Sequence, residues 1–221
     1  LARETSRKRA QEALTRSEER FRILFDRASD GIMIASLSGK LLAVNESFAR
    51  MHGYTSEEML TMSLKDLDTP ETFRAGPERR QRLLSGEAMT FEAKHYRKDG
   101  IVIPLEVSAS LIDSAGAPLI QSFHRDISER KRAEDMNARL AAIIANSNDA
   151  VVGRSLDNKV TSWNPAAERL FGYSAAEAIG QDNSGLIIPP ERAGELARNR
   201  AQLAQGRGVH DLETVRRTKD G

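Results

Sequence analysis

The chain contains two copies of one sequence pattern, and this repeat constrains its fold more than any other feature. Residues 20–61 fall on residues 139–180 without a gap when they are shifted by 119 positions. Identical residues then meet at ten positions: Arg20/Arg139, Asp30/Asp149, Ser36/Ser155, Leu37/Leu156, Lys40/Lys159, Asn45/Asn164, Arg50/Arg169, Gly53/Gly172, Tyr54/Tyr173 and Glu58/Glu177. The tripeptide Lys-Asp-Gly at 98–100 recurs at 219–221. A period of about 120 residues is too long for a solenoid and is typical of a duplicated domain.

The repeat predicts one complete domain followed by an incomplete one. We expect an amphipathic linker helix over residues 1–20 and a first domain over residues 17–127. A connecting helix over residues 128–147 then leads into a second domain over residues 139–221. The second copy lacks the last two strands of the first, so we expect residues beyond Gly221 in a longer parent to complete it.

Composition excludes several classes of protein. The 221 residues are 39% hydrophobic and 29% charged, with a net charge of +1, which suits a globular chain without a global attraction to nucleic acid. No apolar run approaches the length of a membrane span, and the charged first 20 residues form no signal peptide. The absence of cysteine excludes disulfides, thiolate metal sites and thiol nucleophiles. We therefore expect a cytoplasmic fragment with no membrane segment.

Two stretches carry the spacing of a coiled-coil seam. Apolar or small residues recur every three or four positions within residues 1–28, at Ala10, Leu14, Ser17, Phe21, Leu24 and Ala28. The same spacing returns at Ala133, Met136, Leu140, Ile143 and Ser147. A capping box at Thr15 and Glu18 leaves a break in the first helix open. Two seams favour a homodimer through parallel helices, and helices packed on their own domain remain the alternative.

Between these helices the sequence predicts an α+β domain. Strands are expected at 31–36, 41–44, 89–97, 101–111 and 118–126, with short helices at 45–52, 56–60 and 77–84. In the second copy we expect strands at 150–155 and 210–217. Such a domain is a five-stranded antiparallel sheet with short helices on one face, and a ligand cavity can form between the two layers.

These motifs, in order and repeated, resemble the PAS sensory domains of bacterial signalling proteins. The resemblance lies in Asp30-Gly31-Ile32, in Asn45, in the Gly53–Glu58 segment Gly-Tyr-Thr-Ser-Glu-Glu and in Lys98-Asp99-Gly100. A C-terminal PAC-like part, about 89–132, ends in Arg-Asp-Ile-Ser-Glu-Arg-Lys at 125–131. The second copy repeats Asn164, the 172–177 segment and the Lys-Asp-Gly tripeptide. The resemblance covers about residues 17–132 and 139–221.

The resemblance implies a sensory module that passes a ligand- or partner-induced change through dimeric helices to an output domain in cis. A sensor histidine kinase is the first choice of parent, and a cyclic-di-GMP cyclase or phosphodiesterase is the second. A ligand-free spacer that only dimerises is the alternative. The chain shows no catalytic constellation and no metal-ligand spacing, so we assign no catalytic and no metal-binding residues.

The resemblance also suggests two groups of site residues. Asp126 and Ser128 link the last strand to the outgoing helix, and Arg97 or Lys98 is the expected cation for Asp126; we assign these four to signal relay, with a plain helix cap at Asp126 as the alternative. The ligand pocket is expected to be lined by Ile32, Ile34, Val44, Phe48, Met51, His95 and Phe123.

The sequence does not identify a cofactor. A covalent chromophore is excluded because relatives attach it through cysteine. Haem is disfavoured because the segments 77–86 and 190–205 lack the usual axial histidine, although His52, His95 and His124 lie elsewhere. A non-covalent flavin stays open. His210 resembles a kinase phosphoacceptor, but the repeat aligns it with a strand, so we reject that role.

Overall fold

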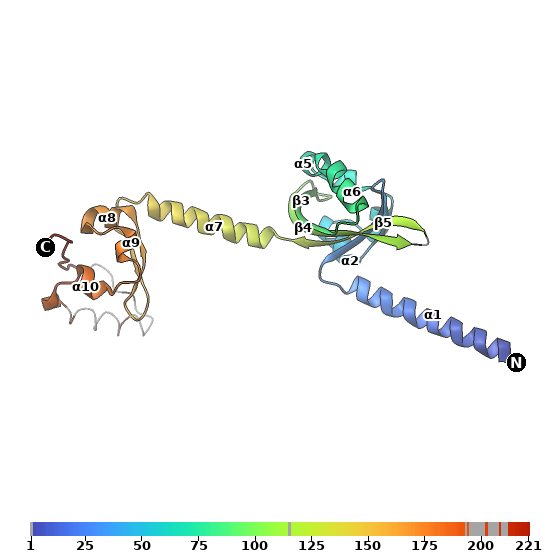
Figure 1. The fold of residues 1–221 in the computed structure, drawn as a ribbon, viewed down its shortest axis with the longest axis horizontal. Coiled ribbons are helices and arrows are strands. Elements are labelled where there is room, and N and C mark those ends of the chain that lie inside the picture. Colours follow the sequence, from blue (N-terminus) through green and yellow to red (C-terminus); the bar gives the residue numbers. More distant parts are fainter. Residues whose placement is uncertain (1, 115, 193, 195–201, 203–207, 209–211) are drawn as a thin grey trace. The chain divides into compact units, whose positions relative to one another are not determined.

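The computed structural model describes residues 2–114, 116–192, 194, 202, 208 and 212–221 (Figure 1). The chain divides into two compact units, residues 1–132 and residues 133–221. Among the described residues, no helix combines the length and the apolar character that crossing a membrane requires.

The first unit is built on the five-stranded antiparallel sheet that the sequence predicts. Its strands are β1 (Gly31–Ser36), β2 (Leu41–Val44), β3 (Met89–Tyr96), β4 (Val102–Ser114) and β5 (Ala117–Asp126). Their order across the sheet is β2-β1-β5-β4-β3, so the last strand lies centrally, beside the first. The Lys-Asp-Gly turn joins β3 to β4 as expected.

Five short helices connect β2 to β3: α2 (Glu46–His52), α3 (Ser56–Leu60), α4 (Leu64–Leu67), α5 (Pro70–Arg74) and α6 (Gly76–Leu84). Helices α5 and α6 lie over the β3–β4 part of the sheet (Figure 1). Helix α2 ends at Gly53, whose φ of 77° is a left-handed conformation that glycine adopts without strain. Helices α4 and α5 were not predicted, since each spans a single turn without apolar periodicity.

The core of the first unit lies between α2 and the β1–β2 hairpin. Phe48, Met33, Leu41 and Met59 are fully buried there. Gly31 permits this packing, because a Cβ atom at this position would lie 3.0 Å from the Cα atom of Phe48. The close approach of α2 to β1 therefore depends on a residue without a side chain.

The flanking helices are α1 (Ala2–Asp26) and α7 (Ser128–Ala145). Helix α1 runs without a break through Thr15, whose hydroxyl donates to the carbonyl of Gln11, so the capping box left open by the sequence does not form. Both helices expose large apolar side chains at the predicted seam positions, Phe21, Leu24, Met136, Leu140 and Ile143.

The second unit reproduces the first half of the fold. It contains β6 (Val152–Arg154), β7 (Val160–Trp163), α8 (Pro165–Phe171), α9 (Ala175–Ala178), α10 (Asn183–Ile187) and the 3-10 turn η1 (Pro190–Arg192). Strands β6 and β7 form a two-stranded antiparallel sheet. The core is built around Trp163, Phe171 and Val160.

The strand expected at 210–217 is a wrong prediction for residues 212–217, which form no strand. Residues 209–211, including His210, lie outside the described residues, as does most of the segment 190–205. In the first unit, β3 pairs with β4, which follows the Lys-Asp-Gly turn. Among the described residues of the second unit, the sheet consists of β6 and β7, and no strand pairs with residues 212–217.

One buried asparagine in each unit ties the preceding helix to the domain. The side-chain oxygen of Asn45 accepts from the amides of Ile32 (2.8 Å) and Phe48 (2.9 Å). Its side-chain nitrogen donates to the carbonyls of Phe25 (2.9 Å) and Asp30 (3.0 Å). The predicted cap on α2 is thus confirmed, and the same side chain also holds the last turn of α1 and the start of β1.

Asn164 repeats this arrangement in the second unit. Its oxygen accepts from the amides of Val151 and Ala167, both at 2.9 Å. Its nitrogen donates to the carbonyls of Ile144 in α7 (3.0 Å) and of Asp149 (2.9 Å). In both units, therefore, all four hydrogen-bonding positions of the amide are used.

Replacing Asn45 by Ala should destabilise the first unit by roughly 3 kcal/mol, because the buried amides of Ile32 and Phe48 lose their acceptor. Urea unfolding can assign the loss to one unit, since Trp163 is the chain's single tryptophan and reports on the second. Asn45→Ala should shift part of the far-ultraviolet circular dichroism transition and leave the tryptophan transition in place. Asn164→Ala is the matched control and should shift the tryptophan transition. Equal shifts of that transition in both variants would contradict this assignment.

Candidate functional site

A cavity of about 190 Å³ lies between the sheet and the helices α4–α6. Part of its apolar lining comes from β3, β4, β5 and α6: Leu83, Phe91, Ala93, Val107, Ala109 and Ile120. Its polar lining includes Asp68, Thr72, His95, Ser122 and His124. Pockets for drug-sized ligands usually hold about 300–1,000 Å³, so this size favours a ligand of few heavy atoms over a flavin.

A buried hydrogen-bonded chain runs along one side of this cavity. His52 on α2 directs Nδ1 at the Phe48 carbonyl (2.9 Å) and Nε2 at His95 Nδ1 (2.9 Å). His95 on β3 directs Nε2 at Asp68 Oδ1 (3.2 Å), in the loop after α4. Both imidazoles are almost completely buried. The chain therefore joins α2, the edge strand and the loop leading into α5.

The partners of these atoms fix where the protons are. A carbonyl can only accept, so His52 Nδ1 carries a hydrogen, and Nε2 of a neutral His52 accepts from His95 Nδ1. His95 Nε2 then faces Asp68 Oδ1 at 3.2 Å.

The surroundings of His52 disfavour a charge on its ring. Burial and, next in importance, the nearby His95 lower the pKa of His52 from 6.5 to about 4. The ring packs against Phe48, with 4.4 Å between the ring centroids. At neutral pH His52 is therefore uncharged.

His124 on β5 has an unused hydrogen-bonding atom. Its Nε2 lies 2.9 Å from the hydroxyl of Ser122, whereas Nδ1 is buried and has no hydrogen-bond partner. Burial, followed by the nearby His95 and His52, lowers the pKa of His124 well below its usual value. The ring is 2% exposed and forms part of the cavity wall. A neutral, half-satisfied imidazole thus lies at the cavity.

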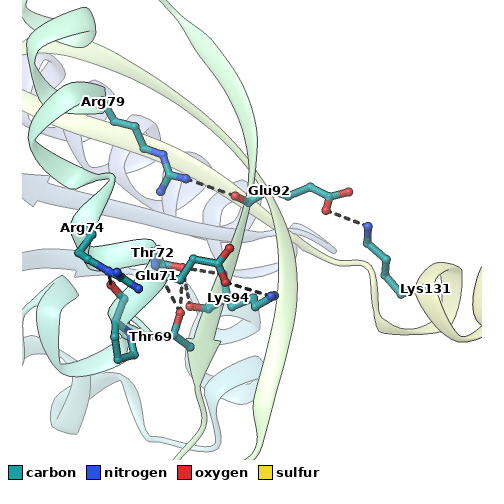
Figure 2. Close-up of polar contacts among 9 residues, drawn as sticks. Thr69, Glu71, Thr72, Arg74, Arg79, Glu92, Lys94 and Lys131 are labelled. Atoms are coloured by element: carbon teal, nitrogen blue, oxygen red, sulfur yellow. Dashed lines mark hydrogen bonds and ion pairs between the residues drawn. The ribbon is translucent and has the colours of Figure 1, made fainter.

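Helix α5 lies along the free edge of β3 (Figure 2). Its residues Thr72 and Phe73 contribute to the lining of the cavity. The hydroxyl of Thr72 donates to the Lys94 carbonyl (2.9 Å) and accepts from the Lys94 amide (2.9 Å). The Thr69 amide donates to the same carbonyl (3.1 Å), and Glu71 pairs with the Lys94 ammonium group (3.1 Å). These contacts replace the ladder that a sixth strand would provide.

Glu92 on β3 connects the cavity wall with the outgoing helix (Figure 2). Its carbonyl accepts from the guanidinium of Arg79 (3.4 Å), a cavity-lining residue of α6 whose guanidinium also lies 3.9 Å above the ring of Phe91. Its carboxylate pairs with Lys131 (2.8 Å) and Arg130 (3.4 Å) in the first turn of α7. A displacement of α6 or β3 can therefore reach the start of α7 through one residue.

The four residues assigned to signal relay lie in two separate places. Asp126 Oδ1 accepts from the amide of Ser128 (2.7 Å), which confirms the helix cap. Lys98 pairs with Glu58 (2.6 Å), and Arg97 pairs with Asp99 (3.5 Å), so neither supplies the expected cation for Asp126. The turn places Lys98 against Glu58 of α3. A role of these residues in transmission stays a prediction.

The contact of Lys98 explains why two of the repeated motifs occur together. Lys98 also lies 5.4 Å from the ring centre of Tyr54, and its amide donates to the His52 carbonyl. Lys219 pairs with Glu177, stands 5.4 Å from the Tyr173 ring and donates its amide to the Phe171 carbonyl in the same manner. The Lys-Asp-Gly turn and the Gly-Tyr-x-x-x-Glu segment therefore form one structural contact in each unit.

Of the seven residues expected to line the pocket, His95 does so. Val44 and Phe48 belong to the core beside β1, and Met51 packs against the buried cluster of β3 and β4. Ile32, Ile34 and Phe123 lie on the alternate side of their strands, and Phe123 is 42% exposed. Adjacent residues of a strand face opposite sides of the sheet, so Met33, Ser122 and His124 line the cavity in their place.

Sequence reasoning did not assign Asp68, Ser122 and His124 to the pocket. A signal was present in β5, where Gln121 and Arg125 alternate with Ile120, Ser122 and His124. The polar residues Gln121 and Arg125 mark the exposed face of β5. Phe123 lies on the same side of the strand as these two residues, so the pattern would have placed Phe123 outward. Asp68 had no such signal, because it follows the unpredicted helix α4. In the described part of the chain, no three His, Asp or Glu residues are arranged to hold a metal ion.

Comparison with known proteins identifies the family. A profile described as PAS fold matches residues 138–221, and a profile described as PAS domain matches residues 29–129. The chain belongs to the PAS domain family and contains two PAS domains in tandem. The crystal structure of a PAS domain of an HTR-like protein from Haloarcula marismortui is similar, with a TM-score of 0.51 and 25% identity, over 54% of this chain and 99% of that one.

Three curated relatives are similar in sequence. The methyl sulfide methyltransferase-associated sensor of Methanosarcina acetivorans is 36% identical over 168 residues, 74% of this chain and 17% of the sensor. The probable diguanylate cyclase DgcE of Escherichia coli and the sensor histidine kinase TmoS of Ectopseudomonas mendocina are each 28% identical, over 62% and 64% of this chain. The matches cover 13% of DgcE and 15% of TmoS, so the chain spans less than a fifth of each relative.

The buried histidines predict that acid destabilises the first PAS domain. Because the pKa of His52 is about 4 in the folded state and 6.5 as its ordinary value, protons bind the unfolded state more tightly. The stability is therefore complete above about pH 6.5 and is lost as the pH falls toward 4, by roughly 3 kcal/mol for this shift. The lowered pKa of His124 likewise reduces the stability of the folded state as the pH falls.

Urea unfolding followed by circular dichroism between pH 7.5 and 4.5 tests this prediction. His52→Gln keeps one donor and one acceptor but does not titrate, so its free energy of unfolding should fall less steeply than that of the wild type. The carboxylates titrate in both proteins, and the difference between the two curves isolates the contribution of His52. Parallel curves would show that His52 is protonated as easily in the folded state as in the unfolded state.

Proposed function

We propose that this chain is the sensory part of a longer signalling protein, in which the first PAS domain detects a small molecule. The module passes the change through α7 to the second PAS domain and to an output domain in cis. The observation that carries the proposal is the Arg79–Glu92–Lys131 connection between the cavity wall and the outgoing helix. A ligand-free spacer would be expected to fill this volume with apolar side chains, whereas the cavity carries converging polar groups.

A sensor histidine kinase is the parent that we propose, with a cyclic-di-GMP cyclase as the second candidate. The similarity to TmoS supports the first and the similarity to DgcE supports the second. The described residues offer no catalytic arrangement of their own, and the matched relatives are much longer than this chain. The activity would then belong to a domain outside these residues.

The ligand would act on α7 by changing how its first turn is held. A molecule in the cavity contacts α6 and β3, and α6 donates through Arg79 to Glu92. Lys131 and Arg130 would move with the Glu92 carboxylate, because both are paired with it. The hydrogen bond from the Ser128 amide to Asp126 fixes the residue at which α7 begins. We therefore assign Asp126 and Ser128 to the pivot of this movement. Arg97 and Lys98 would hold α3 against the turn between β3 and β4.

A cavity-filling substitution can imitate an occupant and test the connection. Ala109→Leu adds a side chain at the cavity and should change amide hydrogen exchange in the first turn of α7, residues 128–132. The same substitution in a Glu92→Gln background should leave this exchange unchanged, because the ion pairs with Arg130 and Lys131 are gone. Glu46→Gln, which removes an exposed ion pair on α2, is the matched control and should preserve the response.

Two results would overturn the proposal in different ways. An unchanged α7 after Ala109→Leu in both backgrounds would mean that the cavity and the outgoing helix are not coupled. A response of equal size in the Glu92→Gln background would mean that the cavity and the outgoing helix are coupled, but not through Glu92. Thermal unfolding of each variant establishes that exchange is compared between folded proteins.

The seam positions in α7 (Ala133, Met136, Leu140 and Ile143) support a parallel homodimer. Met136, Leu140 and Ile143 are 54%, 50% and 61% exposed, and no residue described in α7 is buried. Water-exposed apolar residues at heptad spacing are buried when two identical helices pair in register. A dimer would let both cavities act on one pair of helices.

Disulfide formation can detect this pairing without background, since the chain has no cysteine. Leu140→Cys lies on the seam and should give a covalent dimer under mild oxidation, because a parallel pair brings both copies of the residue together. Ala138→Cys lies on the opposite side of the same exposed helix and should remain monomeric. Equal yields from the two positions would indicate random collision and argue against the parallel dimer.

A further inference from the structure

We infer that the cavity of the first PAS domain takes a small amphipathic anion, whose carboxylate-like group pairs with Arg79 and Arg80 of α6 while its apolar body enters the cavity. This inference names the ligand class for the sensory role proposed above and rests on that role. It follows from the residues that α6 turns toward the cavity, from the hydrogen-bond donors that they leave unused and from the charges of the lining.

Helix α6 turns two charged positions toward the cavity. Four of its lining residues stand at positions i, i+3, i+4 and i+7, which form one face of a helix: Gly76, Arg79, Arg80 and Leu83. On a helix that packs over a sheet, this face is normally apolar. In α6 only Leu83 fits that rule and is buried, whereas the two middle positions are arginines. Packing alone gives no reason for cations at these two positions.

Both arginines keep hydrogen-bond donors that no described group of the protein accepts. Nη2 of Arg79 donates to the Glu92 carbonyl (3.4 Å; Figure 2), whereas Nε and Nη1 reach the accessible surface and have no partner among the described residues. The Arg79 guanidinium lies 3.9 Å above the ring of Phe91, another lining residue. Arg80 is exposed and makes no hydrogen bond or ion pair with a described residue. Donors of both side chains are thus available to an occupant.

The lining also has an excess of positive charge. Three of the described lining residues are cationic and one carries a carboxylate: Lys65, Arg79, Arg80 and Asp68. Oδ1 of this carboxylate already lies 3.2 Å from His95 Nε2. Burial lowers the pKa of Arg79, against the opposite effect of nearby carboxylates, so this cation has lost part of its hydration without forming an ion pair with a described residue. An anion beside α6 would supply the counter-charge.

The interior of the cavity sets the rest of the ligand. Beyond the arginines, Leu83, Val107 and Ile120 offer apolar surface, so burial of an apolar body there is favourable. An inorganic anion would leave this surface unused, and an apolar molecule would leave the arginine donors unused. A carboxylate matches the planar guanidinium, because the two groups can form parallel charge-assisted hydrogen bonds. The cavity therefore favours a molecule that has both parts.

Such an anion would act on the connection to α7. The hydrogen bond from Arg79 to the Glu92 carbonyl is long, at 3.4 Å, and a carboxylate is a stronger acceptor than a carbonyl. Binding would therefore draw Arg79 away from Glu92, whose own carboxylate pairs with Lys131 in the first turn of α7. Occupation of the cavity is thus linked to release of this contact.

Calorimetry on the whole 221-residue chain with hexanoate, 1-hexanol and acetate tests the inference. Hexanoate should bind about tenfold more tightly than 1-hexanol, since a hydrogen bond to a charged group contributes about this factor. Acetate has the charge without the apolar body and should bind about tenfold or more weakly than hexanoate, because it buries less apolar surface.

Substitutions on α6 assign the preference to the two arginines. Arg80→Gln keeps a hydrogen-bond donor without the charge and should reduce the preference for hexanoate over 1-hexanol severalfold. Arg79→Gln combined with Arg80→Gln should abolish it. Arg82→Gln is the matched control, because it removes a cation of the same helix that pairs with Glu87 and does not line the cavity. This variant should keep the full preference.

A second measurement needs no substitution, in case the double variant does not fold. The ¹⁵N resonance of Arg79 Nε should move when hexanoate is added and should stay in place with an equal concentration of 1-hexanol. Hexanoate should also change amide hydrogen exchange in the first turn of α7, residues 128–132. Ala109→Leu, which fills the cavity, should weaken binding of both six-carbon probes.

The possible failures separate the ligand class from the sensory role. Equal or tighter binding of 1-hexanol would overturn the anionic class and keep a ligand-binding cavity, and acetate equal to hexanoate would overturn the apolar body. An undiminished preference in the double variant would remove the arginines from the site. Hexanoate binding with unchanged exchange at 128–132 would keep the ligand class and overturn its link to α7. No binding of any probe at about 10 mM, where small ligands of efficient pockets bind, would overturn both the inference and the proposed sensing by this cavity.

Discussion

The structure depends first on one fully used amide side chain in each PAS domain. Asn45 accepts from two backbone amides and donates to two carbonyls, and these four groups belong to the incoming helix, the first strand and α2. Asn164 makes the same four bonds. A buried polar group of this kind is stabilising only when every partner is present. The last turn of α1, or of α7, therefore cannot move independently of the domain that follows it.

The other end of the domain, where the outgoing helix begins, is held by a different kind of contact. The outgoing helix begins at the Asp126 cap and is held to the sheet by the exposed pairs of Glu92 with Arg130 and Lys131. Exposed ion pairs are individually weak and easily exchanged. The incoming helix is thus fixed by buried hydrogen bonds, and the outgoing helix by contacts that a small displacement can alter. Such an asymmetry suits a module that transmits a change in one direction along the chain.

The interior of the first domain combines apolar packing with an uncommon number of buried histidines. The rings of Phe48, His52, His95 and His124 form a closed cluster in which each ring contacts two others, with neighbouring ring centroids 4.4–5.6 Å apart. Burial keeps His52 and His124 neutral, and His95 lies between His52 and Asp68 in the hydrogen-bonded chain. The second domain carries Phe171 at the position of His52 and Ala167 at the position of Phe48, and it shows no such chain among its described residues. The two copies share a scaffold, and the polar cavity lining distinguishes the first.

From the sequence alone one can predict the duplication, the five strands of the first domain in their chain order, the cap at Asn45 and the family. These features are local: turn residues, strand-forming runs and a repeat can each be recognised within about ten neighbouring positions. The tertiary structure alone decided which side of each strand lines the cavity, because a shift of one residue exchanges the two faces of a sheet. It also decided that Lys98 meets Glu58, that Asp68 joins two histidines, and that residues 212–217 form no strand. Each of these depends on a partner distant in sequence, and no local pattern specifies such a partner.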